Sequence, residues 1–351
     1  MLSEGEKKYY DRHLRLPNFG LEAQSKLKNA SVLVIGAGGL GVPVLNYLAA
    51  AGVGSITVID DDRIDETNLH RQVLYSMDEV GEFKAQIAVN KISKQNPHIR
   101  IECIMDRLSK SNALKLVKKA DVVVDCSDNF ATRYLVNDAC VIQNKPFVYG
   151  AIDQFSGQLS VFNLDDGPTY RCLFSEAPNA GEAPSCAEVG VLGVLPGLIG
   201  SYQALECIKV LTGIGQSLSG KLLWIDTLLN AQQTFKVPAV PTNKEIKTLG
   251  TYEALCGDDI PQILVEDYRR MDNTFLLDVR EPYEFDNYNL GGTLIPLNSL
   301  ANRVHELPTD KNIVVLCAKG IRSQSACEFL HSHNFKVFNL TGGLSKIKIL
   351  E

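Results

Sequence analysis

No segment near the start of the chain combines basic residues with a following apolar core, so we expect no secreted product. Long apolar runs are also missing, because the longest, residues 189–200, is interrupted by Pro196 and is too short to cross a bilayer. The nine cysteines include no closely spaced pairs, which predicts reduced thiols in a cytoplasmic protein. The net charge of -6 leaves no excess of positive charge, which argues against nucleic acid as a main partner.

With 351 residues, of which 45% are hydrophobic and 22% charged, the chain has the composition of a globular protein and enough length for two domains. Residues 238–261 contain three prolines, two glycines and little periodicity, which is typical of a linker. We therefore predict a first α/β domain over residues 1–237, a linker over 238–261 and a second, smaller α/β domain over 262–351.

A nucleotide-binding unit is predicted over residues 31–60. An apolar run is followed by a glycine-rich turn, by a helical pattern to Ala51 and by a second apolar run ending in Asp60, 24 residues beyond the first glycine. This spacing is typical of a Rossmann-like βαβ unit, in which glycines let the backbone approach a phosphate. The glycines are Gly36, Gly38, Gly39 and Gly41. The alternative is a tight turn that binds no nucleotide.

The segment after this unit indicates which chemistry the nucleotide undergoes. Polar and charged side chains gather where the carboxyl end of the sheet is expected. They are Asp60, Asp62, Asn68, Arg71, Gln72 and, further along, Lys84. An oxidoreductase that transfers hydride has no use for a second set of phosphate clamps, whereas an adenylating enzyme must stabilise charge on a triphosphate. We therefore favour adenylation over a NAD-type Rossmann oxidoreductase.

A later strand ends in a further polar cluster. After helices predicted over residues 85–95 and 109–119, a buried strand ends in Asp125-Cys-Ser-Asp128-Asn129. We predict that Asp128 binds the magnesium ion of the bound nucleotide. The alternative is that Asp128 caps the helix that begins near Phe130.

From residue 145 onward, closely spaced strands predict an antiparallel extension of the sheet. These strands are expected at residues 147–150, 156–163, 221–226 and 232–237. Residues 165–185 are rich in Pro, Gly and Ser, which predicts a mobile loop. Cys186 follows this loop, just before a helix that runs to about residue 211, and it is either an exposed nucleophile or a small buried residue.

Cys317 is the candidate nucleophile of the second domain. A strand ends there, and a short loop then leads through Gly320 and Arg322 to a helix over residues 323–333. The helix N-terminus and the N–H groups of the loop favour a thiolate or persulfide over a neutral thiol. Four residues separate Cys317 from Arg322, one fewer than in a phosphatase of similar design, so the ring suits a sulfur atom and predicts sulfur transfer. The alternative is a buried core cysteine.

Together these motifs resemble the MoeB/ThiF (HesA/MoeB/ThiF) family of relatives of ubiquitin-activating enzymes, followed by a rhodanese domain. The first resemblance rests on the glycine turn, Asp60-x-Asp62, Asn68-Leu-His-Arg71-Gln72, Lys84, the 125–129 cluster and Cys186-Ala-Glu-Val-Gly190. The second rests on Asp278-Val-Arg280-Glu and Cys317-x-x-Gly-x-Arg322-Ser323. The resemblance implies a fused adenylyltransferase and sulfurtransferase.

The resemblance also implies roles for the matching residues. ATP lies on the glycine turn with its ribose at Asp60, the phosphates bind Asn68, Arg71 and Lys84, and Mg²⁺ binds Asp128. The nucleotide site is completed by Asp62, Gln72 and Asn129. Residues 3–29 look by themselves like a solvated helix. The resemblance instead implies that Arg12 reaches the triphosphate of a neighbouring subunit, which predicts a homodimer.

The implied substrate is the C-terminal glycine of a small ubiquitin-like sulfur carrier protein ending in Gly-Gly. Examples are the small subunit of molybdopterin synthase and a ThiS-like protein of thiamine biosynthesis. ATP converts this carboxylate to an acyl adenylate, and a persulfide on Cys317, loaded by a cysteine desulfurase or thiosulfate, turns it into a thiocarboxylate. Cys186 is implied as an acyl-disulfide partner. A non-catalytic carrier-binding scaffold is disfavoured, because the phosphate clamps and the thiol loop are both intact.

One departure from the family concerns zinc. Most members bind a structural zinc ion through two Cys-x-x-Cys pairs, whereas here Cys172 stands alone with Thr169 in the place of its partner, and only Cys256 appears later. Two thiols do not make a four-ligand tetrahedral site, so we expect no structural zinc.

Overall fold

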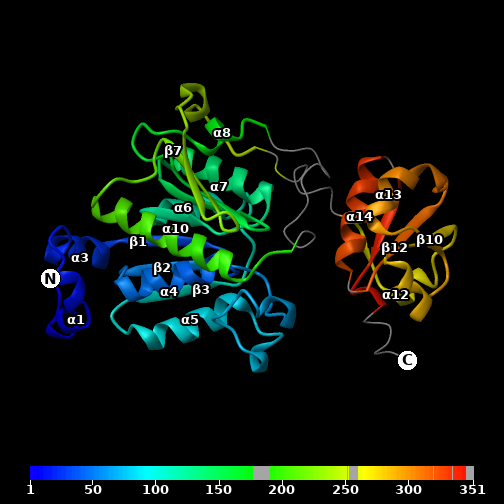
Figure 1. The fold of residues 1–351 in the computed structure, drawn as a ribbon, viewed down its shortest axis with the longest axis horizontal. Coiled ribbons are helices and arrows are strands. Elements are labelled where there is room, and N and C mark those ends of the chain that lie inside the picture. The colour runs from blue at the N-terminus through cyan, green and yellow to red at the C-terminus, as the bar shows by residue number, and fades with distance from the viewer. Residues whose placement is uncertain (177–189, 251, 253–259, 319, 334, 345–351) are drawn as a thin grey trace. The chain divides into compact units, whose positions relative to one another are not determined.

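The structure, a computed structural model, describes residues 1–176, 190–250, 252, 260–318, 320–333 and 335–344 (Figure 1). The chain forms two compact units, one ending at Gly250 and the other built from the described residues beyond it. Among the described residues, no helix is long and apolar enough to cross a membrane. The cysteines within the described ranges carry free thiols.

The first unit is built on one mixed sheet with the strand order β3-β2-β1-β4-β5-β6-β7-β8. Its strands are β1 (Ser31–Ile35), β2 (Ser55–Ile59), β3 (Arg100–Ile104), β4 (Val122–Asp125), β5 (Phe147–Asp153), β6 (Ser156–Phe162), β7 (Lys221–Asp226) and β8 (Ala231–Lys236). The pairs from β3 to β5 are parallel, and those from β5 to β8 are antiparallel. The predicted Rossmann-like sheet with an antiparallel extension is therefore confirmed.

The centre of this sheet is apolar on both faces. Strand β1 pairs with β2 on one side and with β4 on the other, so that Val34 lies opposite both Val58 and Val124. All three valines are fully buried. Strands covered on both faces need such continuous β-branched runs, which is why the apolar pattern of the sequence located them correctly.

Helices cover the sheet of the first unit. They are α1 (Glu4–Tyr9), α2 (Asp11–Leu14), α3 (Gly20–Asn29), α4 (Gly41–Ala51), α5 (Lys84–Gln95), α6 (Ala113–Lys119), α7 (Phe130–Gln143), α8 (Tyr170–Leu173) and α10 (Val194–Thr212), with the short turns η1 (Glu66–Asn68), η2 (Met77–Glu79) and η3 (Pro241–Lys244). Helix α10 packs along α4 and over β4–β6 (Figure 1). Right-handed crossovers place α4 and α5 on one face and α6 and α7 on the other, because the chain changes direction across the sheet after β3.

Three local expectations need correction. The helical segment over residues 3–29 is divided into α1, α2 and α3. The helix predicted from residue 109 begins at Ala113, because the Asn112 side chain accepts a hydrogen bond from the Ser109 N–H and holds residues 109–112 in a turn. Within the predicted 165–185 loop, α8 forms because Tyr170 is buried against other aromatic rings, including Tyr134. Residues 177–185 lie outside the described part.

The second unit is a smaller parallel sheet with the order β11-β10-β12-β13-β9. Its elements are β9 (Gln262–Ile263), α11 (Val265–Tyr268), β10 (Thr274–Asp278), α12 (Pro282–Asn287), β11 (Thr293–Leu294), α13 (Leu297–Arg303), η5 (Val304–Glu306), β12 (Asn312–Leu316), α14 (Ile321–Ser332) and β13 (Val337–Leu340). The central strand β12 is buried from Ile313 onward. This confirms the predicted smaller α/β domain.

Part of the predicted linker packs on the first unit. The Lys244 Nζ donates to the Asp165 carbonyl at 2.9 Å, and the Val240 N–H donates to the Cys172 Sγ at 3.3 Å. The bounds 1–237, 238–261 and 262–351 stay a prediction.

Candidate functional site

The first candidate site lies where the strand order of the large sheet reverses, between β1 and β4. The chain leaves these adjacent parallel strands at the same edge, so the glycine turn after β1 meets the polar loop after β4. The two backbones touch, because a Cβ on Gly36 would lie 3.0 Å from the Cys126 carbonyl oxygen. In open α/β sheets, ligands bind at this kind of reversal.

The glycine turn itself admits no larger residues at its ends. Gly36 has a φ of +94°, and a Cβ on Gly41 would lie 2.0 Å from the Gly36 carbonyl oxygen. The buried Tyr75 hydroxyl donates to the Ala37 carbonyl at 2.7 Å, and it lies 3.3 Å from the Lys84 carbonyl. The turn is therefore tight and anchored, and it leads into the N-terminus of α4. Sequence reasoning missed Tyr75, which no local motif marks.

Asp60 is held beside this turn. Its Oδ2 accepts a hydrogen bond from the Ala37 N–H at 2.7 Å, and its Oδ1 accepts one from the Asp62 N–H at 2.8 Å. Burial raises the pKa of Asp60, while the Ala37 N–H and the charge of Lys84 oppose that rise. Each carboxylate oxygen has a second lone pair, so Asp60 keeps the capacity to accept from ribose hydroxyls.

The predicted phosphate-binding residues form two groups near the turn. In one group, Asn68 Oδ1 accepts from Arg71 Nη2 at 2.9 Å and from Gln72 Nε2 at 3.2 Å. Gln72 Nε2 lies 3.5 Å from where a Gly38 Cβ would stand. In the other group, the buried Lys84 Nζ pairs with Asp62 Oδ2 at 2.6 Å. The structure thus brings Arg71 and Gln72 to the glycines, and Lys84 to Asp62.

The loop after β4 settles the question of the helix cap. The Asn129 side chain is the N-cap of α7 and accepts from the Thr132 N–H at 2.9 Å. The alternative of Asp128 as the cap is therefore wrong, and Asp128 is exposed at the strand end. Asp125 is fully buried, which raises its pKa, and its Oδ1 accepts from the Ser127 N–H and hydroxyl at 3.0 and 2.6 Å.

Two further side chains hold this loop, and sequence reasoning missed both. Gln203 on α10 donates to the Asp125 carbonyl at 2.7 Å. Arg133 on α7 donates to the Ser127 carbonyl at 3.2 Å. Arg133 lies only six residues beyond Ser127, so the sequence offered a signal for this contact. The partner of Gln203 lies 78 residues away, and no local pattern connects the two.

Two other predicted residues lie away from these contacts. Arg12 is exposed on the short helix α2, between Asp11 and the half-buried His13. Cys186 lies outside the described residues, as does Cys256.

The second candidate site surrounds Cys317. Its Sγ, at the end of β12, accepts a hydrogen bond from the Gly320 N–H at 3.1 Å, and the buried Ser323 hydroxyl lies 3.4 Å away. Gly320 has a φ of +91° and is the N-cap of α14, so the helix begins directly at the loop. Cys317 is 2% exposed. The loop therefore surrounds the sulfur with uncharged donors and a helix N-terminus.

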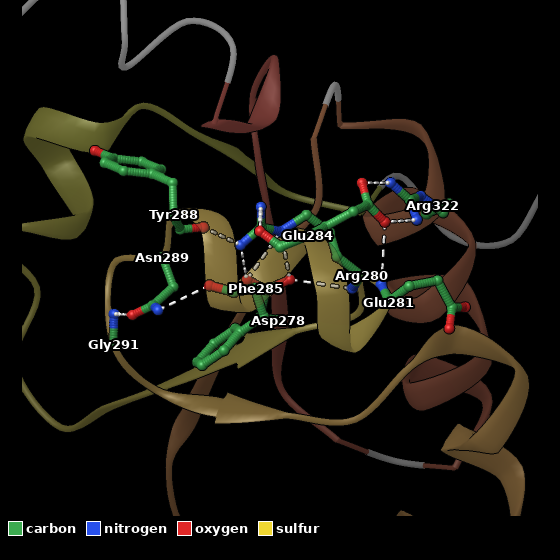
Figure 2. A network of polar contacts seen from close by, with 9 residues as sticks. All are labelled: Asp278, Arg280, Glu281, Glu284, Phe285, Tyr288, Asn289, Gly291 and Arg322. Carbon is green, nitrogen blue, oxygen red and sulfur yellow. Dashed lines mark hydrogen bonds and ion pairs between the residues drawn. The ribbon is translucent and has the colours of Figure 1, made fainter.

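Arg322 is paired with Glu284, as Figure 2 shows. Its Nη1 and Nη2 pair with the two carboxylate oxygens of Glu284 at 2.6 and 2.7 Å. These hydrogen bonds from Arg322 lower the pKa of Glu284, against the effect of partial burial. No sequence motif assigned a role to Glu284, because its partner Arg322 lies 38 residues further along the chain.

The surroundings of Cys172 do not fit a zinc site. Thr169 and Cys172 lie against Val240 and Asn243, and four donors other than thiols surround the one sulfur: the Val240 N–H at 3.3 Å, the Thr169 N–H and hydroxyl at 3.4 Å each, and the Asn243 side chain at 3.5 Å. Burial raises the pKa of the Cys172 thiol, but these hydrogen bonds outweigh burial and lower it. No cluster of three or more His, Cys, Asp or Glu ligands occurs within the described residues.

The chain matches two family models and several known proteins. The model of the ThiF family matches residues 10–246, and the model of the rhodanese-like domain matches residues 264–350. The chain is 43% identical over 364 residues to the probable adenylyltransferase/sulfurtransferase MoeZ of Mycobacterium tuberculosis, a match that covers 98% of this chain and 93% of the relative. It is 50% identical over 259 residues to the sulfur carrier protein adenylyltransferase of Thermus thermophilus, covering 71% and 96%.

Among solved structures, E. coli MccB with ATP is similar, with a TM-score of 0.59 and 23% identity over 70% of this chain and 75% of that one. At this identity the likeness concerns the fold alone.

The surroundings of Cys172 generate a first prediction. Metal analysis of the purified protein should find far less than one zinc per chain, and a chelator should leave its unfolding temperature unchanged. Cys172→Ala should instead lower the free energy of unfolding by about 1 to 2 kcal/mol, because the donors that surround the sulfur lose their acceptor. Stoichiometric zinc, lost together with the thiol, would contradict this account.

Proposed function

The chain belongs to the ThiF family and carries a rhodanese-like domain, and from this premise we propose that it adenylates the C-terminal glycine of a small ubiquitin-like sulfur carrier protein and then transfers sulfur to it. Its two-domain relative MoeZ, an adenylyltransferase/sulfurtransferase, matches nearly the whole chain, so this protein is an enzyme of that kind. Neither the oxidoreductase nor the scaffold alternative gains support from these relatives.

One structural observation supports the proposed adenylation activity. At the sheet reversal, the glycine turn, the Asn68–Arg71 pair and the exposed carboxylate of Asp128 lie on segments that leave the sheet at the same edge. The N-terminus of α4 and the glycine backbone bind phosphate, and Asp60 accepts from the ribose. The relative from T. thermophilus, a sulfur carrier protein adenylyltransferase, supports ATP as the nucleotide.

In the adenylation step, an oxygen of the carrier's terminal carboxylate attacks the α-phosphorus of ATP. The bond from that phosphorus to the bridging oxygen breaks, and pyrophosphate leaves. Charge grows on the phosphate oxygens, where Arg71 and Lys84 stabilise it. In the absence of ATP the charge of Lys84 is compensated by Asp62, and a bound triphosphate takes over that role.

Asp128 fits the Mg²⁺ that accompanies ATP. Its carboxylate is exposed, and Mg²⁺ prefers oxygen ligands. The N-cap of α7 is Asn129, so the Asp128 side chain is not needed to cap that helix. The ion compensates the charge of the triphosphate.

In the sulfur-transfer step, a persulfide on Cys317 attacks the carbonyl carbon of the acyl adenylate, and AMP leaves. The product is an acyl disulfide between the carrier and Cys317. A second thiol attacks the sulfur of Cys317, which breaks the sulfur–sulfur bond, releases the thiocarboxylate and leaves a disulfide between Cys317 and that thiol; an external thiol reductant then restores both thiols. Cys186, which the family resemblance implies as a partner in the acyl-disulfide chemistry, is our candidate for this second thiol. Molybdopterin and thiamine carriers, a desulfurase or thiosulfate as donor, and a cytoplasmic location all stay predictions.

A second prediction tests the adenylation site. Asp128→Ala should reduce carrier-dependent exchange between ATP and pyrophosphate by at least about 100-fold, because the charge compensation by the metal is lost. Asp166→Ala, at an exposed aspartate in the loop after β6, is the matched control and should retain exchange. Near wild-type exchange in Asp128→Ala, with the fold intact by circular dichroism, would remove Asp128 from the mechanism.

A third prediction tests a homodimer with composite sites, supported by the exposure of Arg12 on α2. Arg12→Ala and Lys84→Ala should each be inactive in exchange. Random mixed dimers should recover about a quarter of wild-type activity, since half of the dimers then hold one intact site. Arg71→Ala mixed with Lys84→Ala is the control and should recover nothing, because both residues belong to the same subunit's half of the site. Equal recovery in the two mixtures, or none in the first, would contradict donation of Arg12 across the interface.

A further inference from the structure

We propose that Glu284 sets the sulfur-donor preference of Cys317 by masking the charge of Arg322, so that the loop favours donors with little negative charge over the thiosulfate dianion. This inference rests on the proposed sulfur transfer at Cys317. It assigns a role to a residue that neither the sequence motifs nor the relatives single out.

The Glu284 carboxylate covers the charged end of the Arg322 side chain. Glu284 binds Arg322 through both carboxylate oxygens, each to a different Nη atom, at 2.6 and 2.7 Å. Such a two-pronged pair is the strongest arrangement of these groups. The Glu284 side chain is 18% exposed and that of Arg322 is 34% exposed, so water weakens the pair only in part.

Glu284 is held in place by its neighbours. The buried Arg280 pairs with Asp278 at 2.6 Å and donates to the carbonyls of Glu284 and Tyr288 at 3.1 and 2.8 Å, which fixes helix α12 to the end of β10 (Figure 2). Oε2 of Glu284 also accepts from the Glu281 N–H at 3.0 Å. A carboxylate anchored in this way stays beside Arg322 when a donor arrives.

Within the described part of the loop and α14, the hydrogen-bond donors to Cys317 Sγ include the Gly320 N–H and the Ser323 hydroxyl, which carry no net charge. These two hydrogen bonds to the sulfur do not depend on Arg322. What Arg322 adds is attraction for an incoming anion, and Glu284 cancels that attraction. The loop sequence also contains Lys319, which lies outside the described residues.

The chemistry of loading makes donor charge measurable. The Cys317 thiolate attacks the outer sulfur of thiosulfate, the sulfur–sulfur bond breaks, and sulfite leaves with the bonding electrons. Methanethiosulfonate reacts in the same way and releases methanesulfinate, but it carries one negative charge instead of two. In both cases cyanide then removes the outer sulfur as thiocyanate and restores the thiolate.

The test compares these two donors in wild type and Glu284→Gln, with the full-length protein. The glutamine side chain of this variant keeps the shape of the glutamate and an acceptor oxygen for the Glu281 N–H. We expect the KM for thiosulfate to fall about fivefold to tenfold with little change in kcat, and the KM for methanethiosulfonate to fall by about twofold to threefold, because unmasked Arg322 attracts each charge. Asp286→Asn, an exposed aspartate on the same helix, is the matched control and should leave the donor ratio unchanged.

A second background tests whether Glu284 acts through Arg322. With Arg322→Gln in place, Glu284→Gln should no longer change the ratio of the two KM values. An undiminished change there, or the same donor ratio in Glu284→Gln and wild type, would overturn the inference. No thiocyanate from either donor with wild-type protein would instead refute the proposed sulfur transfer at Cys317, and this inference with it.

Discussion

The close approach of two backbone turns at the carboxyl edge of the large sheet is the constraint on which the adenylation site depends. With any side chain at position 36 or 41, atoms would meet the Cys126 carbonyl at 3.0 Å or the Gly36 carbonyl at 2.0 Å. Because both turns are so tight, the start of α4, the Asp60 carboxylate and the loop bearing Asp128 are brought to one edge. The buried valines of β1 and β4 set the two strands in the register that makes this possible.

The same electrostatic arrangement occurs in both units. In each, a cation expected to meet an anionic substrate is paired with a carboxylate: Lys84 with Asp62, and Arg322 with Glu284, both at 2.6 Å. Lys84 is buried, so loss of Asp62 would remove its ion-pair partner and leave only the nearby charge of Asp60 to compensate it. In the first unit we propose that a bound triphosphate replaces the carboxylate, whereas in the second the carboxylate is anchored by its helix. We therefore expect the Lys84–Asp62 pair to separate when a strongly charged ligand binds, and the Arg322–Glu284 pair to weaken the binding of such a ligand.

Much of this fold follows from local sequence pattern, because continuous β-branched runs have few other uses than buried strands. The positions of the strands along the chain were predicted for that reason, whereas the glycine turn and the cysteine loop were predicted from their motifs. The choice of Asn129 over Asp128 as helix cap was not, since both side chains cap helices well and one position separates them. Long-range partners escaped prediction entirely: Glu284 meets Arg322 across 38 residues, and Val240 meets Cys172 across 68. No periodicity connects residues so far apart.

The central claim is that one chain activates a carboxylate at one site and delivers sulfur to it from another. The most direct measurement is mass spectrometry of a Gly-Gly-ended carrier incubated with ATP, a sulfur donor and either wild-type protein or Cys317→Ala. The account predicts a thiocarboxylate with the wild type and with the control Cys327→Ala, a buried cysteine of α14, but only the acyl adenylate with Cys317→Ala. A thiocarboxylate formed by Cys317→Ala, or no adenylate at all, would contradict it.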